Sequence, residues 1–125
     1  MTLDLATQLS PPNSLVLIVA SEHPDIPILD GVLVASTDTC IAVGTLMELD
    51  GETEVRITDG QERTSGLEAA FEAALRTDEG FIAVRTVDGR EVLRHEVAGK
   101  SQQIRVWVSD ASEPDKIVLE LVGHR

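Results

Sequence analysis

Cys40, His23 and His95 are the side chains of this chain that could together supply a nucleophile and a base. A thiol becomes a strong nucleophile when a neighbouring imidazole takes its proton. Cys40, however, lies in an apolar, strand-like run, where a small buried thiol is the ordinary interpretation. His95 falls on the apolar face of an expected hairpin, and His23 lies in a polar loop. We therefore expect a packed His95, a solvent-facing His23 and no catalytic site, so the chain is predicted not to be an enzyme.

The segment 109–115, SDASEPD, carries three carboxylates, those of Asp110, Glu113 and Asp115. Calcium prefers about six to eight oxygen ligands, which one loop with three carboxylates does not provide. The sequence also contains no CxxC pair, HExxH motif or glycine-rich phosphate loop. We interpret the segment as a solvated acidic turn and predict neither a metal nor another cofactor.

The net charge of −12 limits the classes of partner that the protein can bind. Such a charge repels both the phosphate backbone of nucleic acids and anionic lipid. Aromatic residues make up 2% of the chain, too few for the stacking platforms of single-strand binders. We expect no direct nucleic-acid binding and no membrane binding. Cys40 stands alone, which excludes an internal disulfide and favours a cytoplasmic location.

The acids are distributed unevenly, and four of them crowd around one turn. Residues 1–64 hold 11 acids and 2 bases, whereas residues 65–125 hold 11 acids and 8 bases. The crowded carboxylates are the predicted partner-binding site: Glu48, Asp50, Glu52 and Glu54. Like charges this close cost stability, so their clustering favours a basic partner over a role in solubility alone. The alternative is an ordinary charged hairpin tip.

Arg85, Arg90 and Arg94 form the basic cluster of the sequence. In a two-residue hairpin register these arginines share one face with Glu96, which would balance part of their charge. A contact with an anion or an acidic segment, including the protein's own N-terminal half, is the alternative.

The only helix expected from the sequence covers residues 65–78. Leu67, Phe71 and Leu75 recur with helical spacing, together with Ala70 and Ala74. Ser65 and Glu68 have the spacing of a capping box, and Gly80 is a natural helix stop. We predict that this amphipathic helix packs its apolar stripe on a sheet built from both halves of the chain.

Short apolar runs on either side of this segment predict about eight strands. They lie at residues 15–20, 31–36, 40–49, 53–58, 81–87, 90–97, 104–108 and 117–121. Asp50-Gly51 and Asp88-Gly89 have the composition of two-residue hairpin turns. The run from Leu15 to Ala20 is continuously apolar, which suits a strand covered on both faces.

Short connections favour antiparallel neighbours, because a parallel return needs a long crossover. We expect a mainly β protein, an antiparallel β-sandwich or curved barrel of about eight strands with one helix. A two-layer α+β fold is the alternative. Residues 1–13, which end in LSPPN, are predicted to be an N-terminal arm, and residues 14–125 a single β-rich domain.

These features favour a small acidic binding protein that docks on a basic protein partner, of which an inhibitor or an immunity protein is one form. The alternative is a structural or accessory subunit that self-associates through exposed strand edges, forming a homodimer.

Overall fold

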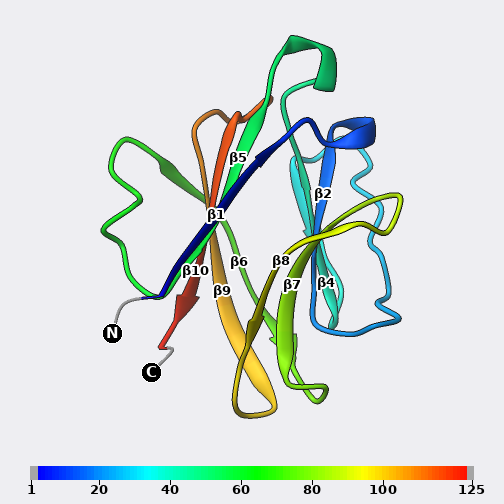
Figure 1. Cartoon of the computed structure of the whole chain (residues 1–125), viewed down its shortest axis with the longest axis vertical. Coiled ribbons are helices and arrows are strands. Elements are labelled where there is room, and N and C mark those ends of the chain that lie inside the picture. The colour runs from blue at the N-terminus through cyan, green and yellow to red at the C-terminus, as the bar shows by residue number, and fades with distance from the viewer. Residues whose placement is uncertain (1–2, 124–125) are drawn as a thin grey trace.

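The chain folds into ten strands and two short 3-10 turns in a computed structural model that describes residues 3–123 (Figure 1). In chain order these elements are β1 (Asp4–Leu9), η1 (Pro12–Ser14), β2 (Leu15–Val19), β3 (Val34–Ser36), β4 (Cys40–Gly44), η2 (Glu48–Asp50), β5 (Thr53–Thr58), β6 (Glu68–Arg76), β7 (Phe81–Thr86), β8 (Glu91–Glu96), β9 (Ser101–Val108) and β10 (Lys116–Val122). Residues 1–2 of the predicted arm and residues 124–125 of the predicted domain lie outside the described residues.

The strands form two five-stranded sheets that face each other, as Figure 1 shows. Sheet A has the order β1-β5-β10-β9-β6, and sheet B has the order β3-β4-β2-β7-β8. Both sheets end in edge strands, so the predicted sandwich is confirmed and the barrel alternative is excluded. Neighbours are antiparallel except for β5 and β10, which pair in parallel. These two strands are far apart in sequence, so the rule of short connections does not apply to them.

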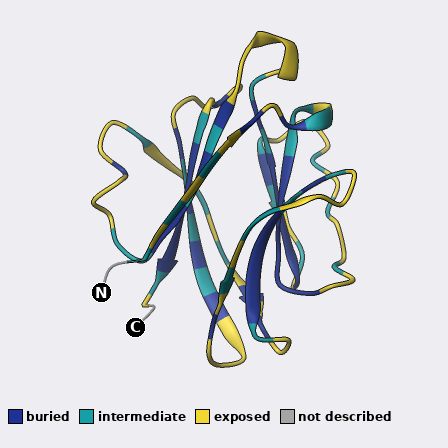
Figure 2. Cartoon of the chain, in the orientation of Figure 1, coloured by how far each residue is buried: buried dark blue, intermediate teal, exposed yellow. Residues whose placement is uncertain are grey.

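The core lies between the sheets and follows from the alternation of side chains along each strand (Figure 2). On β9, Ile104 and Val106 are fully buried between the sheets, whereas Arg105 and Trp107 lie on the outer face. Val16, Ile18, Ile82 and Val84 of sheet B oppose them. The core is therefore built from valine, isoleucine and leucine, as the low aromatic content requires.

Sheet B carries a second apolar layer on its outer face. Its buried members are Leu17, Val19, Cys40, Ala42, Phe81 and Ala83. Leu29, from the long connection between β2 and β3, packs against this layer and covers part of it. Strand β2 is thus buried on both faces, which confirms the prediction from its continuous apolar run.

The predicted helix at residues 65–78 is wrong, because Glu68–Arg76 forms the edge strand β6. The residues Phe71, Ala73 and Leu75 also alternate, and these side chains point toward the core. Pairing along β9 satisfies the strand's backbone, so tertiary context overrides the helix propensity of the alanines. With β6 in sheet A, the α+β alternative is excluded as well. No helix within residues 3–123 is long and apolar enough to cross a membrane.

The predicted hairpin at Asp50-Gly51 is also wrong. Strand β4 pairs with β2 and β3, and β5 pairs with β1 and β10, so neither has a free edge for the other. The segment between them instead crosses from sheet B to sheet A. Within the predicted arm, residues 1–13, Asp4–Leu9 forms β1 and pairs with β5 over its whole length, so this stretch belongs to sheet A.

The hairpin of β7 and β8 has the predicted two-residue register from Phe81 to Val84, on the side away from the turn. Phe81 pairs with Glu96 and Val84 with Leu93, and a bulge then shifts the pairing at Arg85. Gly89 has a φ of 90°, which explains the glycine in the turn.

Replacing Leu75 by alanine tests the strand assignment of β6. Leu75 is fully buried between the sheets, so we expect Leu75→Ala to lower the free energy of unfolding by about 2–5 kcal/mol. The neighbouring Ala74 is exposed, and Ala74→Ser is expected to change it by about 0.5 kcal/mol or less. Urea denaturation of both variants measures this difference. Equal losses would contradict the facing of the strand.

Candidate protein-binding site

The segment 45–52, here called the acidic tip, joins β4 to β5 at one end of the sandwich (Figure 1). Its base is tied down on two sides. The Thr45 amide donates to the Ser14 carbonyl (2.9 Å), and the Leu46 amide donates to the Pro114 carbonyl (2.9 Å). The Asp50 amide donates to the Met47 carbonyl (2.8 Å) and closes η2. The first two hydrogen bonds anchor the base of the tip to η1 and to the 109–115 loop.

The tip presents apolar and acidic side chains together. Glu48, Asp50 and Glu52 are all exposed, and none forms an ion pair with a described residue. Leu49 lies between two of these carboxylates with 91% of its surface exposed, and Met47 is 53% exposed. Figure 2 shows η2 as an exposed projection at the upper end of the molecule. The tip therefore combines an apolar anchor with a negative rim.

Glu54, the fourth predicted site residue, differs from the other three. It lies within β5 on the outer face of sheet A and is half-buried. Its carboxylate is 3.5 Å from the Arg56 guanidinium and 3.9 Å from the Lys116 ammonium group. The structure thus brings three of the four predicted carboxylates together on the tip and places the fourth in an ion-pair network.

Internal ion pairs occupy most of the protein's positive charge. The bases that form them are Arg56, Arg63, Arg76, Arg85, Arg94, Arg105 and Lys116. In the described part of the chain, only Arg90 and Lys100 have no ion pair. Because the bases are already paired, they do not neutralise the acids of the tip.

The predicted arginine cluster binds an acid from the N-terminal half of the chain. The Arg85 guanidinium is 2.5 Å from the Glu22 carboxylate and 3.2 Å from that of Glu91. Arg94 contacts both of these carboxylates and lies 3.9 Å from the centre of the Phe81 ring. Because Phe81 belongs to the outer apolar layer of sheet B, Arg94 covers part of that layer. Arg90 is outside these pairs.

Cys40 and His95 are not placed to act together. Cys40 pairs with Val19 on the outer face of sheet B, and burial raises the pKa of its thiol to about 12. His95 lies opposite Ile82, whose side chain points into the core, so it is on the other face of the sheet. Two strands, β2 and β7, separate them. His23 is exposed in its loop, as predicted.

Asp110 organises the acidic loop between β9 and β10. Its carboxylate accepts hydrogen bonds from the Ser112 amide, the Ser112 hydroxyl and the Glu113 amide, at 2.8–2.9 Å. These bonds hold the pKa of Asp110 below its usual value. No group of three or more potential metal ligands occurs among residues 3–123.

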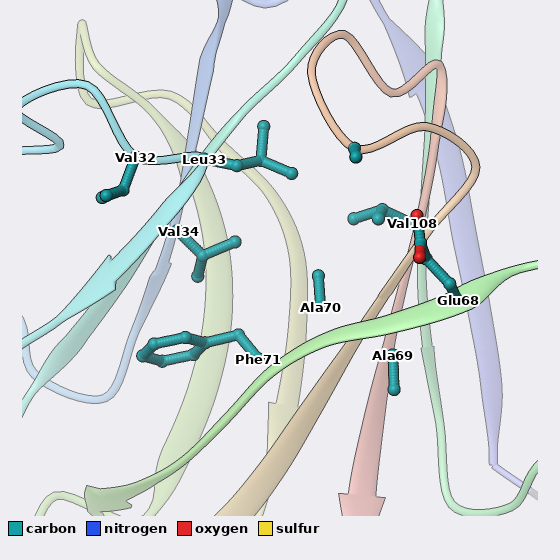
Figure 3. Close-up of a pocket in the computed structure, with 9 residues that line it drawn as sticks. Val32, Leu33, Val34, Glu68, Ala69, Ala70, Phe71 and Val108 are labelled. Carbon is teal, nitrogen blue, oxygen red and sulfur yellow. The ribbon is translucent and has the colours of Figure 1, made fainter.

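A hollow of about 390 Å³ opens beside this loop, between the edge strands β3 and β6 (Figure 3). It is lined by Val32, Leu33, Val34, Glu68, Ala69, Ala70, Phe71, Val108 and Ala111. A second hollow, lined by Gly44 and Ser112, shares Val32, Leu33 and Ala111 with the first. We call the two together the edge groove. It lies next to the tip, because the 109–115 loop borders the groove and binds the tip through Pro114.

Sequence reasoning missed both apolar parts of this region. The sequence predicts a strand at residues 40–49 that includes Leu49, and a predicted helix at residues 65–78 leaves no edge strand β6 to line a groove. A leucine between two acids, two residues before a glycine, is the signal that marks the exposed leucine.

Comparison with known proteins shows the fold. No protein-family model matches the chain, and no curated protein sequence does either. Among solved structures, it is similar to ComJ of Bacillus subtilis, described as an inhibitor of the DNA-degrading activity of NucA. The TM-score is 0.71 with 13% sequence identity, and the alignment covers 98% of each chain. At this identity the likeness shows a shared fold.

The ion pair between Glu22 and Arg85 is expected to affect how the stability of the fold changes at acid pH. The Arg85 guanidinium, followed by Arg94, holds the pKa of Glu22 below its ordinary value of 4.5. A carboxyl whose pKa is lowered by folding stabilises the protein above its unfolded pKa, and this contribution is lost as the pH falls through the folded value. We therefore expect Glu22→Gln to flatten the loss of stability between about pH 5 and pH 3.

Urea denaturation across this pH range measures the effect. Glu113→Gln is the matched control, since its exposed carboxylate has no ion pair within residues 3–123. Parallel plots of unfolding free energy against pH for wild type and Glu22→Gln would show that the ion pairs of Glu22 with Arg85 and Arg94 do not contribute to stability.

Proposed function

We propose that the protein is a non-enzymatic inhibitor that docks its acidic tip on a basic surface of a protein partner. The observation that carries this proposal is the exposed, unpaired state of Glu48, Asp50 and Glu52, in a chain whose described bases are mostly engaged elsewhere. Three carboxylates on one short loop create a negative field that speeds encounter with a cationic surface.

Leu49 supplies the apolar contact that charges alone do not provide. Protein interfaces combine a buried apolar centre with a polar rim, and electrostatic complementarity acts mainly on the association rate. A leucine with 91% of its surface exposed gains from burial in a partner. The bonds of the tip to Ser14 and Pro114 reduce the entropy that binding must remove. The tip thus has both an anchor and a rim.

The fold likeness to ComJ supports the inhibitor form of this proposal. ComJ is described as an inhibitor of a DNA-degrading protein, and the two folds correspond over nearly their whole length. A nuclease binds polyanionic DNA through cationic groups. An acidic projection that is anchored at its base can compete for such a surface, so we propose a nuclease as the partner class.

Neutralising the tip tests the proposed function. Glu48→Gln, Asp50→Asn and Glu52→Gln together are expected to leave the fold intact and to weaken partner capture about tenfold or more at low salt. Affinity capture from the native cells, at low and moderate salt, compares this variant with wild type. The captured fraction is then assayed for degradation of plasmid DNA, which added wild-type protein should suppress and the variant should not.

The control carries the same change in net charge at other exposed acids. In Asp25→Asn, Glu62→Gln and Glu96→Gln, three acids outside the tip are neutralised. Equal loss of capture in both triple variants would mean that net charge, not the tip, attracts the partner. Full capture by the tip variant would refute the proposed site, and unaffected DNA degradation would refute the inhibitor form.

A further inference from the structure

Strands β3 and β6, the edges of the two sheets on the side of the sandwich opposite β1 and β8, meet at one end and separate at the other. At the closed end, the Arg76 amide donates to the Asp38 carbonyl (2.7 Å), and the Arg76 guanidinium lies 3.6 Å from the Asp38 carboxylate. At the other end, near Glu68 and Phe71, the edge groove separates the strands. The edge of β6 is therefore covered at Arg76 and open from Glu68 to Ala74.

The open part of β6 presents unused backbone groups. The Thr77 amide donates to the Lys100 carbonyl (2.9 Å) and so points toward the β9 side. Because successive residues alternate in an antiparallel ladder, the N–H groups of Glu72 and Ala74 point away from β9, as that of Arg76 does. Neither of these two N–H groups has a hydrogen-bond partner among residues 3–123. They form the beginning of a ladder for another strand.

The side chains of this edge leave room for such a strand. Ala69, Ala70 and Ala74 are small and exposed, and β6 contains neither the lysine nor the proline that commonly protects edges. Its protective features are the bulge between Ala69 and Phe71 and the charged side chains of Glu68, Glu72 and Arg76. In Figure 3, Ala70 points into the hollow, whose walls include Val34 and Val108. A strand laid along β6 could bury an apolar side chain there.

We propose that the edge of β6 from Glu68 to Ala74 accepts an extended segment of a basic protein partner as an additional strand of sheet A, with an apolar side chain in the edge groove. This inference rests on the proposed function, in that the segment belongs to the partner bound by the tip. Main-chain hydrogen bonds supply the affinity of strand addition, and the groove supplies the selection of side chains.

Charge complementarity selects this occupant over a second copy of the chain. Glu68 is the one ionisable residue that lines the groove. The lining residues Gly31 and Ser112 are flanked by Asp30 and Glu113. No lysine or arginine lines either hollow. A second copy would bring its own net charge of −12 to this acidic region, whereas a segment with alternating apolar and basic residues would neutralise it.

The test uses a capped synthetic peptide of about ten residues with alternating valine and lysine, long enough to span the open edge. Two-dimensional amide NMR of the isotope-labelled full chain follows the titration. We expect shifts confined to residues 68–74 and the groove, with slower hydrogen exchange at Glu72 and Ala74. A peptide with glutamate in place of lysine should not bind. Binding of both peptides alike, or shifts at β1 or β8, would overturn the proposal.

Two substitutions at one position separate the backbone contact from the side chain. Ala74→Pro removes the outward N–H without removing a bond to β9, and is expected to weaken peptide binding about tenfold or more. Ala74→Ser keeps the N–H and should bind like wild type. Should Ala74→Pro not fold, Ala70→Arg fills the hollow and adds a like charge, with the same loss expected. Unchanged binding by the folded variants would overturn the proposal.

The tip-neutralised variant keeps the two proposals distinguishable. It should bind the peptide with nearly wild-type affinity, because β6 is intact, while losing partner capture. Capture that depends on the tip but not on Ala74→Pro would leave the proposed function standing and refute strand addition. Sedimentation without peptide tests the remaining occupant, a second copy of the chain. If wild type forms a dimer and Ala74→Pro does not, a second copy binds this edge and the proposal is overturned.

Discussion

Burial of the apolar layer between the two sheets is the constraint on which the rest of this structure depends. With so few aromatic residues, the interior must be filled by valine, isoleucine and leucine from the inward faces of both sheets. The alternation of side chains in β5 and β9 meets that requirement, and the edge strand Glu68–Arg76 places Leu75 in the same core. The same packing excludes a hairpin between β4 and β5, and the connecting segment is left to project from the end of the molecule as the acidic tip.

The distribution of charge over the surface follows from this arrangement. On the outer faces of the sheets most bases form ion pairs with acids: Arg56 and Lys116 with Glu54, Arg105 with Glu72 and Glu120, and Arg85 and Arg94 with Glu22. Most of these pairs are partly exposed, and ion pairs near the surface contribute little stability individually. Their larger effect is on the field, since the surplus of acids is concentrated on loops, and the tip holds three acids beside an exposed leucine.

The sequence was informative wherever a local pattern and the tertiary fold agreed. The continuous apolar run of β2 predicted burial on both faces, and Asp88-Gly89 predicted the turn and most of the register of β7 and β8. It failed where one pattern fits two structures. Phe71, Ala73 and Leu75 alternate, while Leu67, Phe71 and Leu75 also have helical spacing, so only pairing with β9 decides between strand and helix. Asp50-Gly51 resembles a hairpin turn, but non-local strand order decides that it crosses between sheets. The acidic cluster could be read from sequence, whereas the edge groove could not, because its walls come from β3, β6 and the 109–115 loop.

Hydrogen exchange of the protein in complex with its captured partner tests whether the acidic tip is the contact surface. Exchange at residues 45–52 is expected to slow on binding, while exchange at the edge strands β1 and β8 remains unchanged. Slowed exchange confined to β1, β8 or the arginine-covered face of sheet B, with the tip exchanging as in the free protein, would contradict this expectation.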